Sequence, residues 1–188
     1  MGKLQQATLD LLDAELRKKS SEFRNYPDDV RFKFYRMEFL IDPLNWEKFY
    51  PRSSRYNYNW KEFKFSDLPN LDRLIKSDDP GVYIFYIKPP ALINDLPKFV
   101  LYVGISNRPL KERLKDYFNL SKIKKRENIH KMLQLYYDHI YVCYSVLSIG
   151  STELSKLEKA LHGFFYPIEA RRDFPAELKK AQKAWGKI

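Results

Sequence analysis

The sequence predicts an α+β fold, in which a small three-stranded antiparallel sheet is flanked by helices and preceded by an N-terminal helical and aromatic extension. Two near-continuous apolar runs at 82–88 and 99–104 have the length and composition of buried strands, and a third follows at 139–147. Segments with apolar residues at helical spacing lie before and after these runs. With 188 residues, the chain is long enough to bury a substantial core.

The predicted extension covers residues 1–66 and begins with an amphipathic helix near 4–22. Near its end, the segment RYNYNW at 55–60 alternates as a short strand does and places Tyr56, Tyr58 and Trp60 on one face. We favour a face that packs on the core, because aromatic side chains usually carry packing. The alternative is a platform on which nucleic-acid bases stack.

The predicted core covers residues 67–188 and ends in a basic tail helix. The first two strands of this core are joined by a loop whose length suits an antiparallel pair. The elements are expected, in order, as a helix at 67–77, strand 82–88, loop 89–98, strand 99–104, helices 108–119 and 124–138, strand 139–147, and helices 151–165 and 175–185.

Charge and composition narrow the classes of function. The net charge is +10, of which +9 falls in residues 81–188, so the predicted core attracts polyanions with an affinity that depends on salt. The single cysteine, Cys143, excludes an internal disulfide framework and a cysteine-based zinc site. No apolar run approaches 18 residues and the N-terminus does not resemble a signal peptide, so we expect no membrane span and a cytoplasmic protein.

An arginine interrupts the apolar stripe of the helix predicted at 108–119. Leu110, Leu114, Tyr117 and Phe118 form that stripe, and Arg113 falls within its arc. Burying an isolated charge is costly, so this arginine is expected to be paired or to face a cleft. The simpler alternative is an arginine whose head group reaches water past the apolar surface.

The helix predicted at 151–165 carries a carboxylate in the equivalent place. Glu158 lies among Leu154, Leu157 and Leu161. Either it pairs with an arginine, with Arg113 as the candidate, or it holds a hard cation such as Mg²⁺ through oxygen. His162 follows one helical turn later and is either a supporting group or a partly buried histidine.

Two tyrosines stand beside glycines in the first two strands. Tyr83, which starts one run, and Tyr102, which ends the next, are expected to meet at the same end of a hairpin. A buried phenol needs a hydrogen-bond partner, so both could be ordinary core residues. Together with one arginine and one carboxylate, however, the set has the chemistry of a phosphoryl-transfer site.

These residues resemble the motifs of the GIY-YIG nucleases. The first motif is Gly81-Val82-Tyr83, the second is Tyr102-Val103-Gly104, NRPLKERLKDYF resembles the helix with the family's arginine, and LEKALHGFFYP resembles the metal-ligand helix. The likeness covers roughly residues 67–170 in the family's order. Many members have an asparagine near the position of Ala170, and some have a lysine where this chain has Ile105 and Ser106.

The resemblance implies a metal-dependent endonuclease. In it, Tyr83 would accept the proton of an attacking water, Arg113 would bind the scissile phosphate, and Glu158 would hold one Mg²⁺, with Mn²⁺ as an alternative. Tyr102 and Tyr117 would position the nucleophile or the phosphate. His162 and Ser106 are expected to support these groups from behind.

The expected partner is nucleic acid, above all double-stranded DNA. A type II restriction-like enzyme is the first expectation, followed by a structure-specific repair or mobile-element nuclease, a catalytically inactive nucleic-acid-binding module, and a plain interaction domain. Cutting both strands would need a homodimer or two visits. The extension is expected to pack on the core and is a further candidate for contacting DNA. The candidate phosphate contacts are Arg108, Lys111, Lys122, Lys124, Lys125, Arg126 and Lys131.

Overall fold

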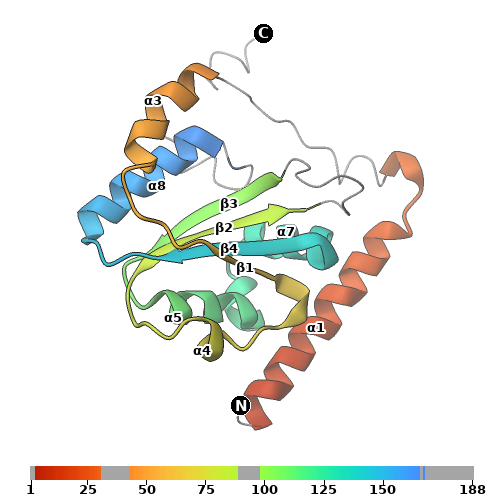
Figure 1. Ribbon diagram of the computed structural model, residues 1–188. Coiled ribbons are helices and arrows are strands. Elements are labelled where there is room, and N and C mark those ends of the chain that lie inside the picture. The colour runs from red at the N-terminus through yellow and green to blue at the C-terminus, as the bar shows by residue number, and fades with distance from the viewer. Residues whose placement is uncertain (1–2, 31–42, 89–97, 166, 168–188) are drawn as a thin grey trace.

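A computed structural model describes residues 3–30, 43–88, 98–165 and 167 (Figure 1). Helices and strands alternate along the core as expected. In chain order the elements are α1 (Lys3–Arg24), α3 (Pro43–Ser53), β1 (Lys61–Lys64), η1 (Phe65–Asp67), α4 (Leu71–Leu74), β2 (Gly81–Ile87), β3 (Phe99–Ser106), α5 (Leu110–Lys115), η2 (Asp116–Phe118), α6 (Leu120–Ile123), α7 (Glu127–Tyr136), η3 (Tyr137–His139), β4 (Ile140–Val146) and α8 (Ser151–Phe165).

The sheet confirms the predicted α+β class but has four strands among the described residues instead of three. Its order is β1-β4-β2-β3, and every neighbouring pair is antiparallel. The additional strand, β1, comes from the segment expected to be an extension. It begins just after the predicted strand at 55–60, because the Asn59 amide donates to the Ser145 hydroxyl and regular pairing with β4 starts only at Lys61.

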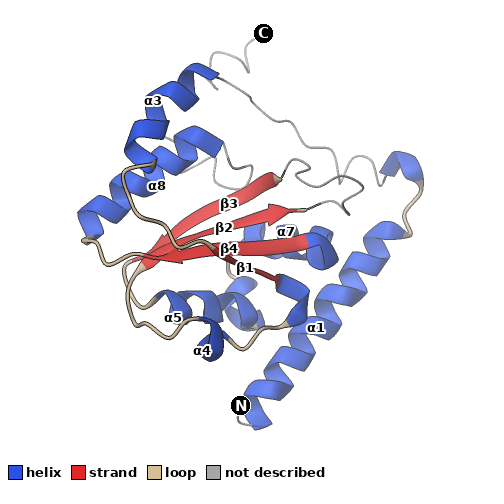
Figure 2. Ribbon diagram, viewed as in Figure 1, coloured by secondary structure: helices blue, strands red, loops and turns tan. Residues whose placement is uncertain are grey.

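Helices cover both faces of this sheet, as Figures 1 and 2 show. On one face, α8 packs against Val82, Ile84 and Val103, and Tyr56 and Tyr58 are partly buried there. Tyr56 and Tyr58 thus pack partly on the core, as we favoured, while Trp60 is exposed and stacks on Tyr58. The other face carries the larger core, which receives side chains from α1, α5, α6 and α7.

Two predicted helices are shorter than expected. The helix predicted at 67–77 is reduced to α4, because Asn70 accepts hydrogen bonds from the amides of Asp72 and Arg73 and so starts the helix there. The helix predicted at 124–138 begins only at Glu127, as α7, and passes into η3 at Tyr137; a break at 124–126 separates it from the short helix α6, which ends at Ile123. Arg126 has non-helical backbone angles at this break, which gives its side chain a direction that a continuous helix would not.

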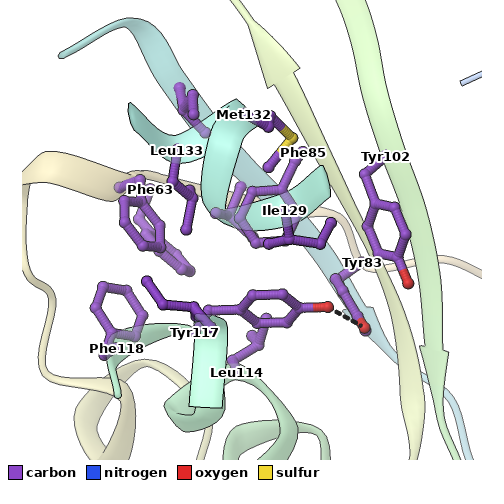
Figure 3. Close-up of a cluster of buried hydrophobic side chains, with 14 of the residues drawn as sticks. Phe63, Tyr83, Phe85, Tyr102, Leu114, Tyr117, Phe118, Ile129, Met132 and Leu133 are labelled. Carbon is purple, nitrogen blue, oxygen red and sulfur yellow. Dashed lines mark hydrogen bonds between the residues drawn. The ribbon is translucent and has the colours of Figure 1, made fainter. Parts of the chain in front are cut away.

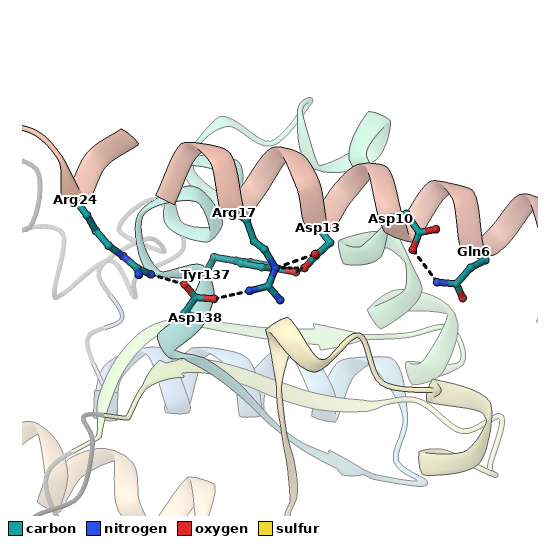
Figure 4. A network of polar contacts seen from close by, with 7 residues as sticks. All are labelled: Gln6, Asp10, Asp13, Arg17, Arg24, Tyr137 and Asp138. Atoms are coloured by element: carbon teal, nitrogen blue, oxygen red, sulfur yellow. Dashed lines mark hydrogen bonds and ion pairs between the residues drawn. The ribbon is translucent and has the colours of Figure 1, made fainter. Parts of the chain in front are cut away.

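The N-terminal helix α1 is fixed to the core by a polar network, shown in Figure 4. The Tyr137 hydroxyl donates to Asp13 over 2.5 Å, and Arg17 donates to both Asp13 and Asp138. Arg24 also bonds Asp138. Under this network, Leu9, Leu12 and Leu16 are buried, so α1 contributes one full side to the larger core.

Some expectations concern residues outside those that the structure describes. These are the loop at 89–98, apart from Lys98, the tail helix at 175–185 and Ala170. Within the described ranges, the helices are too short or too polar to traverse a bilayer.

We predict that Asp13→Asn lowers the free energy of unfolding by about 1–2 kcal/mol at neutral pH. Burial alone would raise the pKa of Asp13, but hydrogen bonds from Arg17 and Tyr137 outweigh it and hold the pKa below its ordinary value of 3.8. A depressed folded-state pKa stabilises the protein above the unfolded-state value, and this contribution disappears as the pH falls through the folded-state value. The difference between the two proteins should therefore shrink below about pH 4.

Urea denaturation at several pH values measures this difference. Asp10→Asn is the matched control, since Asp10 is an exposed carboxylate of the same helix that accepts a hydrogen bond from Gln6 one turn away. An Asp13→Asn deficit that is equally large at pH 3 and pH 7 would contradict the assignment.

Candidate active site

The two strands that carry the tyrosine–glycine motifs pair in a register that places Tyr83 directly opposite Gly104. The ring of Tyr83 lies over the glycine, so a Cβ atom at position 104 would stand 2.5 Å from the Tyr83 hydroxyl oxygen and 2.9 Å from the ring of Tyr102. Contacts this close require a residue without a side chain. Gly81 is constrained in the same way, because a Cβ there would stand 2.4 Å from the Ser145 carbonyl oxygen.

Three phenols gather beside this glycine (Figure 3). The hydroxyl oxygens of Tyr83 and Tyr117 are 2.7 Å apart and share a hydrogen bond in which either can donate. The ring of Tyr102 lies 6.1 Å from that of Tyr83. The expectation that Tyr83 and Tyr102 meet across the hairpin is therefore confirmed, and Tyr117 reaches them from η2.

Arg113 contacts two of these phenols. Leu110 and Leu114 are fully buried, which turns the intervening Arg113 towards the edge of the core. Its Nε donates to the Tyr83 hydroxyl over 3.0 Å, and its guanidinium carbon lies 5.6 Å from the centre of the Tyr117 ring. The alternative in which Arg113 pairs with Glu158 is wrong, because the pair is absent and the two residues belong to helices on opposite faces of the sheet.

Arg126 joins the same cluster from the start of α7. Its Nη2 donates to the Tyr102 hydroxyl over 3.2 Å, and its guanidinium carbon lies 4.9 Å from the centre of the Tyr117 ring. The sequence pattern placed Arg126 only among the surface cations. A signal was present, because Ile129 and Leu133 follow it at helical spacing and both are buried, so that Arg126 lies on the core side of the helix as Arg113 does.

Burial keeps the phenols neutral. It raises the pKa of Tyr83 well above 10, and the neighbouring Tyr117 and Tyr102 act in the same direction, while Arg113 opposes them. Burial also raises the pKa of Tyr117 to about 12. Both side chains are almost completely excluded from solvent, at 0% and 1% exposure. The charge of the cluster near neutral pH is therefore that of its two arginines.

Glu158 and His162 reach β3 from the other face of the sheet. His162 is fully buried and its Nε2 donates to the Val103 carbonyl over 3.0 Å, which fastens α8 to β3 next to Gly104. Figure 1 shows α8 running in the opposite direction to β3. Glu158, half-buried and one turn before His162, is thus displaced towards the end of β3 that holds Gly104 and Ser106.

The donors present fit a magnesium ion that is shared with a substrate. Among the described residues, no group of three or more His, Cys, Asp or Glu side chains could enclose a metal ion. Mg²⁺ prefers to keep several waters and to bind through one or two carboxylates plus substrate phosphates. A single half-buried carboxylate such as Glu158 suits that mode of binding, and it does not suit a closed protein cage.

A shallow depression lies on the solvent side of the cluster, beside the turn that the buried Ser106 holds. The Ser106 hydroxyl donates to the Arg108 carbonyl over 2.7 Å and so holds the turn between β3 and α5. An open depression of about 420 Å³ lies beside this turn, lined by Ile105, Ser106, Asn107, Arg108 and Arg113. Arg113 is therefore accessible from solvent on the side facing this depression.

Most of the other predicted phosphate contacts are engaged in surface ion pairs. Arg108 and Lys122 share Asp116, Lys111 pairs with Asp78, and Lys124 pairs with Glu15. Lys125 and Lys131 are exposed and have no carboxylate partner among the described residues. Because exposed pairs contribute little, these lysines and Arg108 can exchange their partners for phosphates at small cost.

No protein-family model, curated protein or solved structure matches this chain. The likeness to GIY-YIG nucleases therefore rests on the motifs in the sequence and stays a prediction.

We predict that Gly104→Ala destabilises the protein by about 1–3 kcal/mol, because the new methyl group forces the Tyr83 ring out of a fully buried position. Thermal and urea denaturation measure the loss. Gly150→Ala is the control, since a Cβ at position 150 meets nothing within 4 Å. Equal stability of Gly104→Ala and the wild type would mean that the ring can withdraw without cost.

Proposed function

We propose that this protein is a metal-dependent DNA endonuclease that hydrolyses phosphodiester bonds at the edge of β3, with restriction-like enzymes as the nearest functional class. One observation carries the proposal. Two half-buried arginines, Arg113 and Arg126, converge on one phenol ring, and neither has a carboxylate partner among the described residues. Partly desolvated guanidinium groups without counter-charges form a site that is prepared for an anion.

Phosphate is the anion that this site suits best. A guanidinium presents parallel N–H donors that match two phosphate oxygens, and the phenols offer neutral hydroxyl groups without adding negative charge. The charge of +9 in residues 81–188 attracts an extended polyanion more strongly than a small carboxylate ligand. Lys125 and Lys131 are exposed and lie near Arg126 in the sequence, so in this proposal they are candidates for contacting further phosphates along a strand.

The position of β3 supports a site shared by both faces of the sheet. β3 is an edge strand of the described sheet. Because Gly104 has no side chain, β3 is narrow at the point where the phenols meet. In our proposal a DNA strand lies across this edge, contacting Arg113 from one face and Glu158 from the other. Glu158 would hold the magnesium ion, which when bound neutralises charge on the phosphate and polarises its oxygens.

The reaction that we propose is the attack of a water oxygen on phosphorus, with cleavage of the bond to one ester oxygen. Arg113 donates to the non-bridging oxygens and stabilises the charge that builds on them in the transition state. The water loses a proton to the Tyr83 phenolate oxygen, and the leaving ester oxygen takes one from solvent. Tyr117 and Tyr102 keep Tyr83, Arg113 and Arg126 in place through their hydrogen bonds and rings.

A second candidate is a module that binds nucleic acid without cutting it. The burial of Tyr83 favours this alternative, because a phenol with a raised pKa is a poor proton acceptor near neutral pH. In that case the two arginines would still bind phosphate, while the hydrolytic step would be absent.

We predict that the purified protein cleaves plasmid and genomic DNA in the presence of Mg²⁺ and that Glu158→Gln reduces the rate at least about 100-fold. Glu153→Gln is the matched control, because Glu153 lies on the same helix but bonds Tyr56 and Lys156. Discrete fragments would indicate sequence recognition, and nicks or smears would indicate structure-specific or unspecific cleavage. Binding that weakens with salt, without cleavage, would support the second candidate, and the absence of both would contradict the two proposals together.

We further predict that the cleavage rate at saturating DNA rises about tenfold per pH unit between pH 7 and 9, because the phenolate fraction of a base with a raised pKa grows in that proportion. Tyr83→Phe should lower the rate and abolish this slope. A Tyr83→Phe variant that keeps the wild-type slope would show that Tyr83 is not the base and that another group accepts the proton.

A further inference from the structure

We propose that Arg126 is a second phosphate-binding residue of the candidate site and that Arg113 and Arg126 together bind two adjacent phosphoryl groups of one strand. This inference deepens the proposed function and rests on it, since it specifies which substrates the site accepts. The substrates would be strands in which the phosphate being cut is followed by another phosphate.

The two arginines are placed equivalently around Tyr117. Arg113 donates to the phenol of β2, Tyr83, and Arg126 donates to the phenol of β3, Tyr102. Both guanidinium carbons lie within 6 Å of the centre of the Tyr117 ring, so they cannot be farther apart than the sum of the two distances. Phosphates that follow one another along a strand fall within that span, since each nucleotide advances an extended backbone by roughly 6–7 Å, about twice its rise in a duplex.

The phenols hold Arg126 in place but do not neutralise it. A ring face and a neutral hydroxyl stabilise a guanidinium less than an ion pair with a phosphate does. The repulsion between two cations that share one ring also remains. An anion with two charges, or a repeating one, neutralises both guanidinium groups and so removes their mutual repulsion as well. A purely structural role for Arg126 would leave both guanidinium groups without a counter-charge and still repelling each other.

The surrounding cations differ from this pair in a way that supports a separate role. Arg108, Lys122 and Lys124 are exposed and pair with carboxylates, and the partly buried Lys111 pairs with Asp78. Arg113 and Arg126 are half-buried, and within the described ranges their side chains bond phenols and no carboxylate. The surface cations are suited to attracting nucleic acid without fixing its position. The arginine pair is suited to holding the phosphates of one strand in a fixed position.

The test uses the 188-residue chain and pyrophosphate, which presents two linked phosphoryl groups, with inorganic phosphate and chloride compared at equal ionic strength. Binding is followed by calorimetry and by the rise in melting temperature. We expect the wild type to bind pyrophosphate at least about tenfold more tightly than phosphate. Each of the two variants, Arg126→Gln and Arg113→Gln, should weaken pyrophosphate binding about tenfold or more. Arg73→Gln, the same change at an exposed arginine of α4, should stay within about twofold of the wild type.

Two results would overturn the inference. In the first, Arg126→Gln binds pyrophosphate as tightly as Arg73→Gln does. In the second, the wild type binds pyrophosphate no more tightly than phosphate. Arg126→Lys, which keeps the charge but loses the forked donors, covers the case in which the glutamine variant fails to fold and should bind pyrophosphate with intermediate affinity. In DNA binding, Arg126→Gln should also reduce the slope of log affinity against log salt by about one. If pyrophosphate binding depends on Arg126 but the protein cuts no DNA, the proposed function is contradicted and this inference is not. If Arg126→Gln cleaves DNA as fast as the wild type does, this inference is contradicted and the proposed function is not.

Discussion

The contact between the Tyr83 ring and the backbone at Gly104 is the constraint on which the candidate site depends. Because position 104 has no side chain, the ring can lie across β3, and its hydroxyl then reaches Tyr117 and the Nε of Arg113. Tyr117 and Arg113 both come from the segment after β3. The contact between Tyr83 and Gly104 therefore helps to position α5 and η2 on the sheet. A larger residue at this position would displace the Tyr83 ring, whose hydroxyl accepts the hydrogen bond from Arg113.

In the described part of the chain, the side-chain hydrogen bonds of Arg113 and Arg126 go to phenols, and this pairing has an electrostatic effect. A carboxylate would hold each guanidinium more strongly but would cancel its charge. A neutral phenol fixes the position of the arginine and leaves its positive potential intact, and burial raises the pKa of Tyr83 and of Tyr117, so that both phenols are predominantly neutral near pH 7. The surface has the opposite arrangement, with cations such as Lys111 and Lys124 paired to acidic residues.

The regular core was predictable from the sequence because its signals are local. The apolar runs located β2, β3 and β4 to within two residues, and α8 was placed as observed, because buried strands and amphipathic helices have distinct periods. The strand β1 was misplaced, since only its pairing with β4 decides where the ladder begins. The place of Arg126 was missed because it depends on a break between α6 and α7, which shows as a basic run without proline or glycine.

The N-terminal helix and the candidate site share one rigid element. α7 carries Arg126 at its start and leads directly into Tyr137, whose hydroxyl is held by Asp13 of α1, while Glu15 of α1 pairs with Lys124 just before α7. A helix of ten residues is about 15 Å long and transmits a tilt from one end to the other. The amino-terminal segment is thus bonded near both ends of the helix whose start carries Arg126, so we expect substitutions along α1 that shift α7 to change the gap between the two guanidinium groups without altering any residue that lines it.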